Sequence, residues 1–147
     1  MKNTFPDGYK KTTLGFIPDN WEISSLQQLA NIERGKFSAR PRNDPQYFGG
    51  LIPFLQTGDI SNSNGYVTSY QQTLNEKGIN VSKLFKKGTL LITIAANIGY
   101  IAEICFDFSC TDSLVAITPK NNINKNWLKF YLQTQKLNLD SLATQNA

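Results

Sequence analysis

The stretch Thr89-Leu90-Leu91-Ile92-Thr93-Ile94-Ala95 carries the strongest strand signal in the chain, because it is almost continuously apolar and rich in β-branched residues. Such a run predicts a strand that is covered on both faces. Outward from it, stretches rich in strand-forming residues predict further strands at residues 51–57, 66–73, 100–106 and 114–118. Turn-forming residues separate these stretches, so we expect a sheet of short, mostly antiparallel strands.

Helical patterns lie toward both ends of the chain. A Ser-x-x-Gln capping box predicts a short helix over residues 25–32, and Gly35 is placed to end it. Residues 74–78 predict a brief helical turn, and apolar residues at helical spacing predict a last helix over residues 125–142. The expected fold class is therefore α+β: a mixed, mostly antiparallel short-stranded sheet with a short N-terminal helix and a C-terminal helix.

Length and composition favour one folded domain. The chain has 147 residues, of which 40% are hydrophobic and 18% are charged, which is enough for one packed core. Prolines and glycines over residues 1–20 predict an irregular arm; we assign residues 1–12 to it and residues 13–147 to a single domain. No apolar run approaches the roughly 20 residues of a membrane span, and no signal-like apolar region is visible, so a cytoplasmic protein with no membrane partner is expected.

The residue types present disfavour an enzyme. The chain has no histidine, the commonest general base, and its two cysteines, Cys105 and Cys110, are too few for a zinc site. Residues 44–47, Asp-Pro-Gln-Tyr, are close to the Asp-Pro-Pro-Tyr motif of adenine-N6 methyltransferases. The third position differs, however, and no Gly-rich AdoMet-binding turn follows a strand, so we interpret them as a turn. We expect no catalytic residue, metal or cofactor.

A basic segment is the first candidate binding site. The net charge is only +4, but residues 34–42 hold four cations and no acidic residue: Arg34, Lys36, Arg40 and Arg42. Lysine and arginine neutralise phosphates, and arginine also binds guanine through two hydrogen bonds. Ser38 and Asn43 could add phosphate or base contacts. From the residues alone, DNA contact and a solvated charged loop over residues 36–50 are about equally supported.

Polar residues next to predicted strands are further candidates. Thr57 and Asp59 follow a strand; Asp59 could accept a hydrogen bond from cytosine, but its role in a turn is favoured. Asn97 could bind adenine or, beside Gly99, close a hairpin. Three cations before the central strand could flank DNA or form a solvated face: Lys83, Lys86 and Lys87.

Four stretches of the chain, taken in order, resemble a known family. Residues 13–23 contain Gly-x-Ile-Pro-x-x-Trp before the predicted first helix, and Ile32-Glu33-Arg34-Gly35-Lys36 supplies a Gly-Lys after it. Within residues 44–60, Gly-Leu-Ile-Pro-Phe runs into Gly-Asp-Ile, and residues 85–92 with Ile98-Gly99 form a later strand and turn. Together these stretches resemble the target recognition domain of the specificity subunit of type I restriction-modification enzymes.

The resemblance implies a non-catalytic domain that recognises double-stranded DNA and contributes one half of a split target sequence. In that family a complete subunit carries two such domains joined by long helices. It docks with methyltransferase (modification) subunits, and a restriction subunit joins them; AdoMet and ATP belong to those partners. The sequence stops where the family usually continues into a spacer helix, so we expect a single recognition domain that could pair with a second domain or with itself.

An alternative hypothesis is a protein-interaction module that docks on methyltransferase or specificity partners without touching DNA. Exposed apolar residues of the C-terminal helix would then form the interface. The resemblance favours DNA recognition, for which the candidate residues are Lys36, Ser38, Arg40, Arg42, Asn43, Thr57, Asp59 and Asn97.

Overall fold

A five-stranded sheet is the main element of the computed structural model, which describes residues 6–145. Its strands, in spatial order, are β3 (Ala30–Arg34), β11 (Leu114–Pro119), β8 (Leu90–Thr93), β9 (Ile101–Ile104) and β5 (Tyr66–Val67). Neighbouring strands are antiparallel except β5 and β9, which are parallel. Every residue of β8 is buried, which confirms the prediction of a strand covered on both faces.

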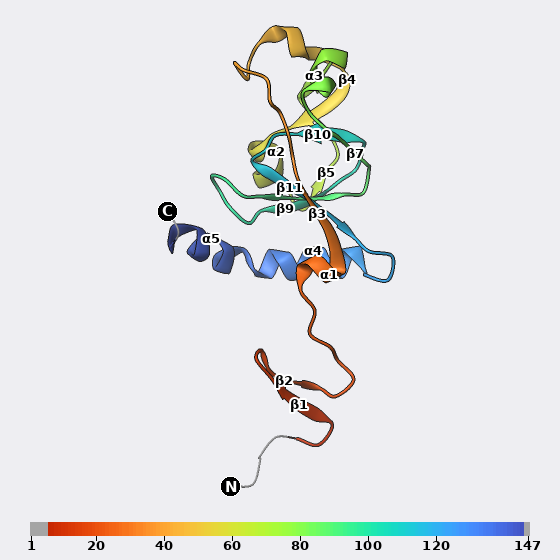
Figure 1. The fold of residues 1–147 in the computed structure, drawn as a ribbon, viewed down its shortest axis with the longest axis vertical. Coiled ribbons are helices and arrows are strands. Elements are labelled where there is room, and N and C mark those ends of the chain that lie inside the picture. Colours follow the sequence, from red (N-terminus) through yellow and green to blue (C-terminus); the bar gives the residue numbers. More distant parts are fainter. Residues whose placement is uncertain (1–5, 146–147) are drawn as a thin grey trace.

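A second sheet lies above the first in Figure 1. Its strands, in spatial order, are β6 (Gln72–Leu74), β4 (Phe48–Leu55), β10 (Phe108–Cys110) and β7 (Leu84–Phe85). β4 and β10 are parallel, whereas the other two pairs are antiparallel. With the antiparallel hairpin of β1 (Tyr9–Thr12) and β2 (Gly15–Pro18) added, most strand pairs are antiparallel, so the predicted fold class is confirmed.

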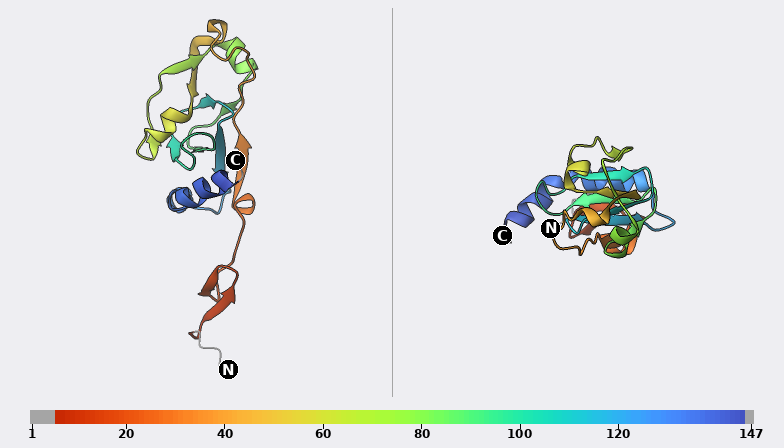
Figure 2. Two further views of the ribbon diagram at one scale, coloured as in Figure 1. Left: turned by 90° about the vertical axis from the view of Figure 1, so that its left-hand side faces the viewer. Right: turned by 90° about the horizontal axis from the view of Figure 1, so that it is seen from above.

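The helices are short except at the C-terminal end. They are α1 (Leu26–Leu29), the 3-10 helix η1 (Pro45–Tyr47), α2 (Thr57–Ser61), α3 (Glu76–Asn80), α4 (Lys125–Thr134) and α5 (Lys136–Gln145). In Figure 1, α4 lies across the lower side of the five-stranded sheet, and the left view of Figure 2 shows the β1–β2 hairpin set apart from both sheets. None of the helices within residues 6–145 is long and apolar enough to cross a membrane.

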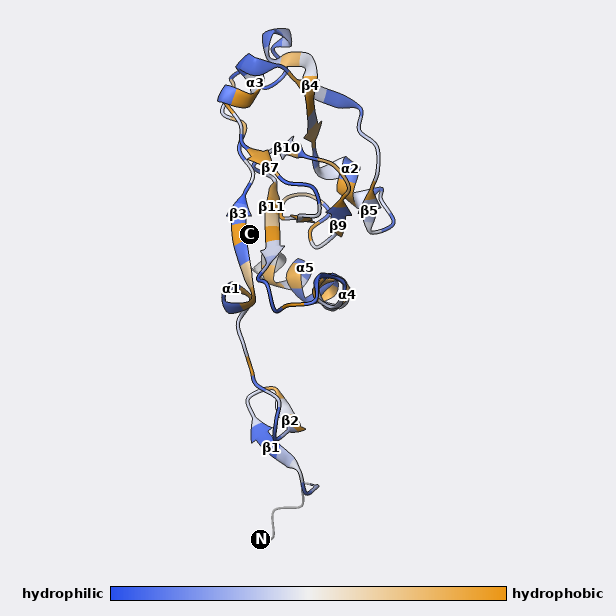
Figure 3. Ribbon diagram, turned by 90° about the vertical axis from the view of Figure 1, so that its right-hand side faces the viewer, coloured by the Kyte–Doolittle hydropathy of each residue, from blue (hydrophilic) through white to orange (hydrophobic). Residues whose placement is uncertain are grey.

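Two apolar layers cover the opposite faces of the five-stranded sheet. On one face, Leu91 packs with residues of the second sheet and α2. On the other face, Leu90 and Ile92 pack against Leu128 and Leu132 of α4. Successive residues of a strand point to opposite faces, so β8 has to be apolar at both sets of positions. The hydropathy colouring in Figure 3 agrees, because hydrophobic stretches concentrate in the strands of the two sheets.

Several predicted boundaries are wrong because contacts distant in sequence decide them. The first helix ends at Leu29, since residues 30–34 pair with β11 as strand β3. Gln135 divides the predicted last helix into α4 and α5. The predicted irregular arm contains the β1–β2 hairpin. Residues 1–5 of the arm, like residues 146–147, lie outside the described residues.

Candidate nucleic-acid interface

Arg34 belongs to strand β3, so from here the name basic segment is used for residues 35–43, which follow that strand. This segment is extended rather than an irregular loop over its first half. Three of its backbone N–H groups donate to carbonyls of other segments: Gly35 to Leu114, Lys36 to Cys110 and Ser38 to Val81. Burial alternates along it, with Phe37 and Ala39 buried and Lys36, Ser38 and Arg40 exposed. The prediction of an exposed loop is therefore wrong for the buried positions, and the cationic side chains occupy the outer side of a strand-like segment.

An aromatic cluster holds the basic segment in place. The ring of Phe37, only 3% exposed, lies 4.8 Å from that of Phe54, 5.8 Å from that of Phe48 and 6.2 Å from that of Tyr47, measured between centroids. These partners belong to β4 and η1. Phe37 thus anchors the segment from its inner side while its neighbours face outward.

The three cations of the segment differ in what they bind. Within the described residues, the ammonium of Lys36 has no hydrogen-bond acceptor or carboxylate partner. The guanidinium of Arg40 donates to the backbone carbonyls of its own segment, at Phe37 and Ala39, which fixes one side of the group. Arg42 makes two parallel hydrogen bonds to the carboxylate of Asp112, at 3.0 and 3.2 Å. Lys36 and Arg40 are therefore the more available cations.

The ion pair of Arg42 holds the pKa of the Asp112 carboxyl below its usual range, through the hydrogen bonds first and the charge second. Asp112→Asn should therefore lower the free energy of unfolding at neutral pH by up to about 1 kcal/mol, the range of half-exposed pairs. A lowered carboxyl pKa stabilises the fold above the unfolded-state pKa, and this contribution is lost as the pH falls through the folded-state pKa.

Urea unfolding of the wild type and Asp112→Asn at neutral and acidic pH measures this effect. Asp19→Asn, which changes an exposed carboxylate beside the β1–β2 hairpin, serves as the control and should change little at either pH. A loss in Asp112→Asn that is equally large in acid would contradict a role for the ion pair.

A turn at residues 111–113 brings the predicted site segments together. Asp112 accepts from Arg42 through its carboxylate and from Arg34 through its carbonyl, the latter at 2.7 Å. The N–H of Thr111 donates to the carbonyl of Leu55, directly before α2. The N–H of residue 94, at the start of the loop that carries Asn97, donates to the carbonyl of residue 113. No local pattern marks Asp112, since its partners are distant in sequence.

Two of the remaining predicted residues, Asp59 and Asn97, have local structural roles. The carboxylate of Asp59 accepts from the backbone N–H of Gln56 at 2.8 Å, the turn role that the sequence favours. Asn97 is exposed and has a φ of 47° next to Ala96 at 39°, and its carbonyl accepts from the Thr93 hydroxyl at 2.6 Å, so it closes the β8–β9 hairpin. Both positions leave polar atoms at the surface.

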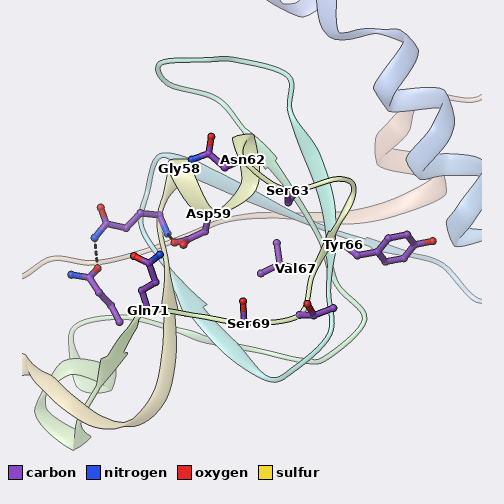
Figure 4. A pocket seen from close by; sticks show the side chains of 11 residues that line it. Gly58, Asp59, Asn62, Ser63, Tyr66, Val67, Ser69 and Gln71 are labelled. Carbon is purple, nitrogen blue, oxygen red and sulfur yellow. Dashed lines mark hydrogen bonds between the residues drawn. The ribbon is translucent and has the colours of Figure 1, made fainter.

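A polar groove beside α2 was not predicted. It has a volume of about 640 Å³ and lies between α2 and the chain that leads to β6. Amides and hydroxyls dominate its lining, including Gln56, Asn62, Ser63, Ser69, Gln71 and Gln72. Figure 4 shows Asn62 at one end of this groove and Ser69 and Gln71 at the other, with Tyr66 pointing away. Residues 66–73 were predicted as one strand, and the break between β5 and β6 is what opens the groove.

An apolar groove of about 600 Å³ lies at the other end of the molecule. Leu14 and Trp21 line it from the N-terminal side and Trp127 and Tyr131 from α4. The rings of Trp127 and Tyr131 are stacked, with centroids 5.5 Å apart and planes 4° from parallel. Both rings are largely exposed, so this groove is the surface that the protein-interaction alternative requires.

The two cysteines are not candidate binding residues. Both are free, and burial raises the pKa of the Cys110 thiol to about 12, which keeps it neutral. Its sulfur lies beneath Gly35, where an added Cβ would come within 2.7 Å of it. Cys110 is thus a packing residue under the basic segment.

Comparisons with known proteins identify a family for the chain. A family model for the type I restriction modification DNA specificity domain matches residues 18–146. The type I restriction enzyme MjaIX specificity subunit of Methanocaldococcus jannaschii is 26% identical over 132 residues, which cover 88% of this chain and 30% of that protein. This chain therefore spans about a third of the length of that relative.

Solved structures share the fold. The HsdS subunit from Thermoanaerobacter tengcongensis has a TM-score of 0.70 at 18% identity, covering 90% of this chain and 32% of that chain. A chain from a structure of complex assembly and conformational transition of the type I R-M system gives 0.68 at 20% identity, covering 84% and 30%. Because the family model spans nearly the whole sequence, this chain belongs to the type I restriction modification DNA specificity domain family.

Proposed function

We propose that this chain recognises a sequence in double-stranded DNA, as one half of a type I specificity subunit, and catalyses no step itself. The observation that carries the proposal is the basic segment, in which Phe37 and Ala39 are buried while Lys36, Ser38 and Arg40 face outward. Cations on an anchored backbone suit a phosphate backbone, because binding releases counterions and does not first have to order the segment that carries them.

The roles of the individual residues follow from their contacts. Lys36 and Arg40 bind phosphates, with Ser38 and Asn43 as neutral donors beside them. The carboxylate of Asp112 occupies two of the Arg42 donors and offsets its charge, so Arg42 contributes less affinity. Thr57, Asp59 and Asn97 supply polar groups for base edges.

The methyltransferase and restriction subunits of the complex are the proposed protein partners, and AdoMet and ATP chemistry belongs to them. The apolar groove at Trp127 and Tyr131 is the surface of this chain that suits such a contact. A second recognition domain, from a longer chain or a second copy, would supply the other half of the target.

A duplex titration tests the proposal. The 147-residue chain is titrated with random-sequence duplex at several salt concentrations, and log affinity should fall against log salt with a slope of about −0.9 for each phosphate contacted. Selection from a pool of duplexes with a randomised core should then return a preferred sequence. Affinity without salt dependence would contradict phosphate contacts, and a stable complex with a methyltransferase subunit but no DNA affinity would favour the protein-interaction alternative.

A further inference from the structure

We infer that the polar groove beside α2 binds the edges of bases and that its amides select adenine. The inference rests on the proposed function and adds to it the place where bases are recognised and the base preferred. The candidates from the basic segment are mainly cations suited to phosphates, whereas this groove has the chemistry of base recognition.

The side chains that line the groove define which base fits. Four of them are amides, at Gln56, Asn62, Gln71 and Gln72, and none is a lysine or arginine. An amide donates to N7 of adenine and accepts from its N6 amino group, so it pairs with adenine through two hydrogen bonds. Guanine offers two acceptors in the major groove and calls for arginine or lysine instead.

One of the amides is already held in position. The carboxylate of Asp59 accepts from the backbone N–H of Gln56, and the side-chain amide of Gln56 donates to Oε1 of Gln72 at 2.5 Å. Oε1 keeps a second lone pair, and no residue that the structure describes accepts from the side-chain nitrogen of Gln72. Gln72 thus offers one acceptor and one donor, the pattern complementary to adenine.

The groove and the basic segment share one support, strand β4. Phe54 of β4 pairs with Gln72 of β6, and its ring packs on Phe37 of the basic segment. Leu55 pairs with Cys110, whose carbonyl accepts from the N–H of Lys36. Phosphate-binding and base-binding side chains are therefore held on the same rigid element, which fixes their register on a duplex.

The test asks whether the side chain of Gln72 binds N7 of adenine. Selection with the full chain from duplexes carrying a randomised core should return an adenine, which is then replaced by 7-deazaadenine to remove N7. The wild type should lose about 5-fold or more in affinity, and Gln72→Ala should lose about 5- to 150-fold on the normal adenine and no more on the analogue. Gln72→Glu, which accepts but cannot donate, should shift the preference toward cytosine.

Matched measurements separate the possible outcomes. Gln27→Ala removes an exposed amide from α1, which lies next to α4 in Figure 1 and lines no part of the polar groove, and should leave the preference unchanged. The two alanine variants, which change no charge, are also titrated with random-sequence duplex, where salt-dependent affinity should equal that of the wild type. An unchanged preference in Gln72→Ala, or a selected site without adenine, overturns this inference and leaves the proposed function standing. A chain that binds no duplex at all overturns both.

Discussion

Phe37→Ala lowers the free energy of unfolding by about 3–5 kcal/mol, the expected loss for a buried phenylalanine cut back to alanine. Phe37 is 3% exposed, and its ring contacts Phe54, Phe48 and Tyr47, with the closest centroids 4.8 Å apart. The substitution removes the apolar surface that these rings share and leaves a cavity that β4 and η1 cannot fill without moving. It also releases the basic segment from its only aromatic anchor within residues 6–145.

Urea unfolding followed by tryptophan fluorescence and circular dichroism measures the loss. Ser38→Ala is the matched control on the same segment, because its hydroxyl is exposed and makes one long hydrogen bond, 3.3 Å to the carbonyl of Val81. It should change stability by less than about 1 kcal/mol. If Phe37→Ala does not fold, Phe37→Leu should still show a loss of about 1–2 kcal/mol. A Phe37→Ala protein as stable as Ser38→Ala would contradict the anchoring role.

The sequence predicts correctly those helices and strands that are determined by their own residues rather than by contacts with distant segments. The strand at residues 90–93 is apolar at its first three positions and buried at all four, as expected for a strand that is covered on both faces. The start of α1 is equally local, because the backbone N–H of Ser25 donates to the side chain of Gln28 as the capping box predicts. The end of α1 is not local, since residues 30–34 gain more by pairing with β11.

The candidate site follows the same division. The cations of residues 36–42 can be identified from the sequence. Their alternation with Phe37 and Ala39 is not recognised as a strand-like pattern, because the prolines and glycines that follow indicate a loop. Which cation is available depends on Asp112, which lies 70 residues from Arg42. The amide groove depends on the contact between Gln56 and Gln72 across 16 residues. Such pairings depend on which strands lie side by side, and the periodicity of a single segment does not specify its neighbours.

Removing both available cations, in Lys36→Ala/Arg40→Ala, should weaken duplex binding on the order of 100-fold, because each charge-assisted contact contributes about tenfold or more. The loss should be similar for random and selected duplexes, since phosphates carry no sequence information. The salt slope should become shallower by about 2, one unit for each cation removed. Titrations of wild type and variant at several salt concentrations give both quantities.

A second double variant separates position from charge. Lys10→Ala/Lys11→Ala removes the same two charges from the β1 strand of the hairpin, which Figure 1 shows apart from both sheets. If the net charge of +4 drew the chain to DNA, the two variants would weaken binding equally. If the anchored segment binds the DNA backbone, only the first variant loses affinity and slope. The guanidinium of Arg40 is held by the carbonyls of Phe37 and Ala39, and Lys36 lies next to the buried Phe37. Equal losses in the two double variants would contradict phosphate binding by the basic segment. The DNA-binding surface would then lie elsewhere on the fold.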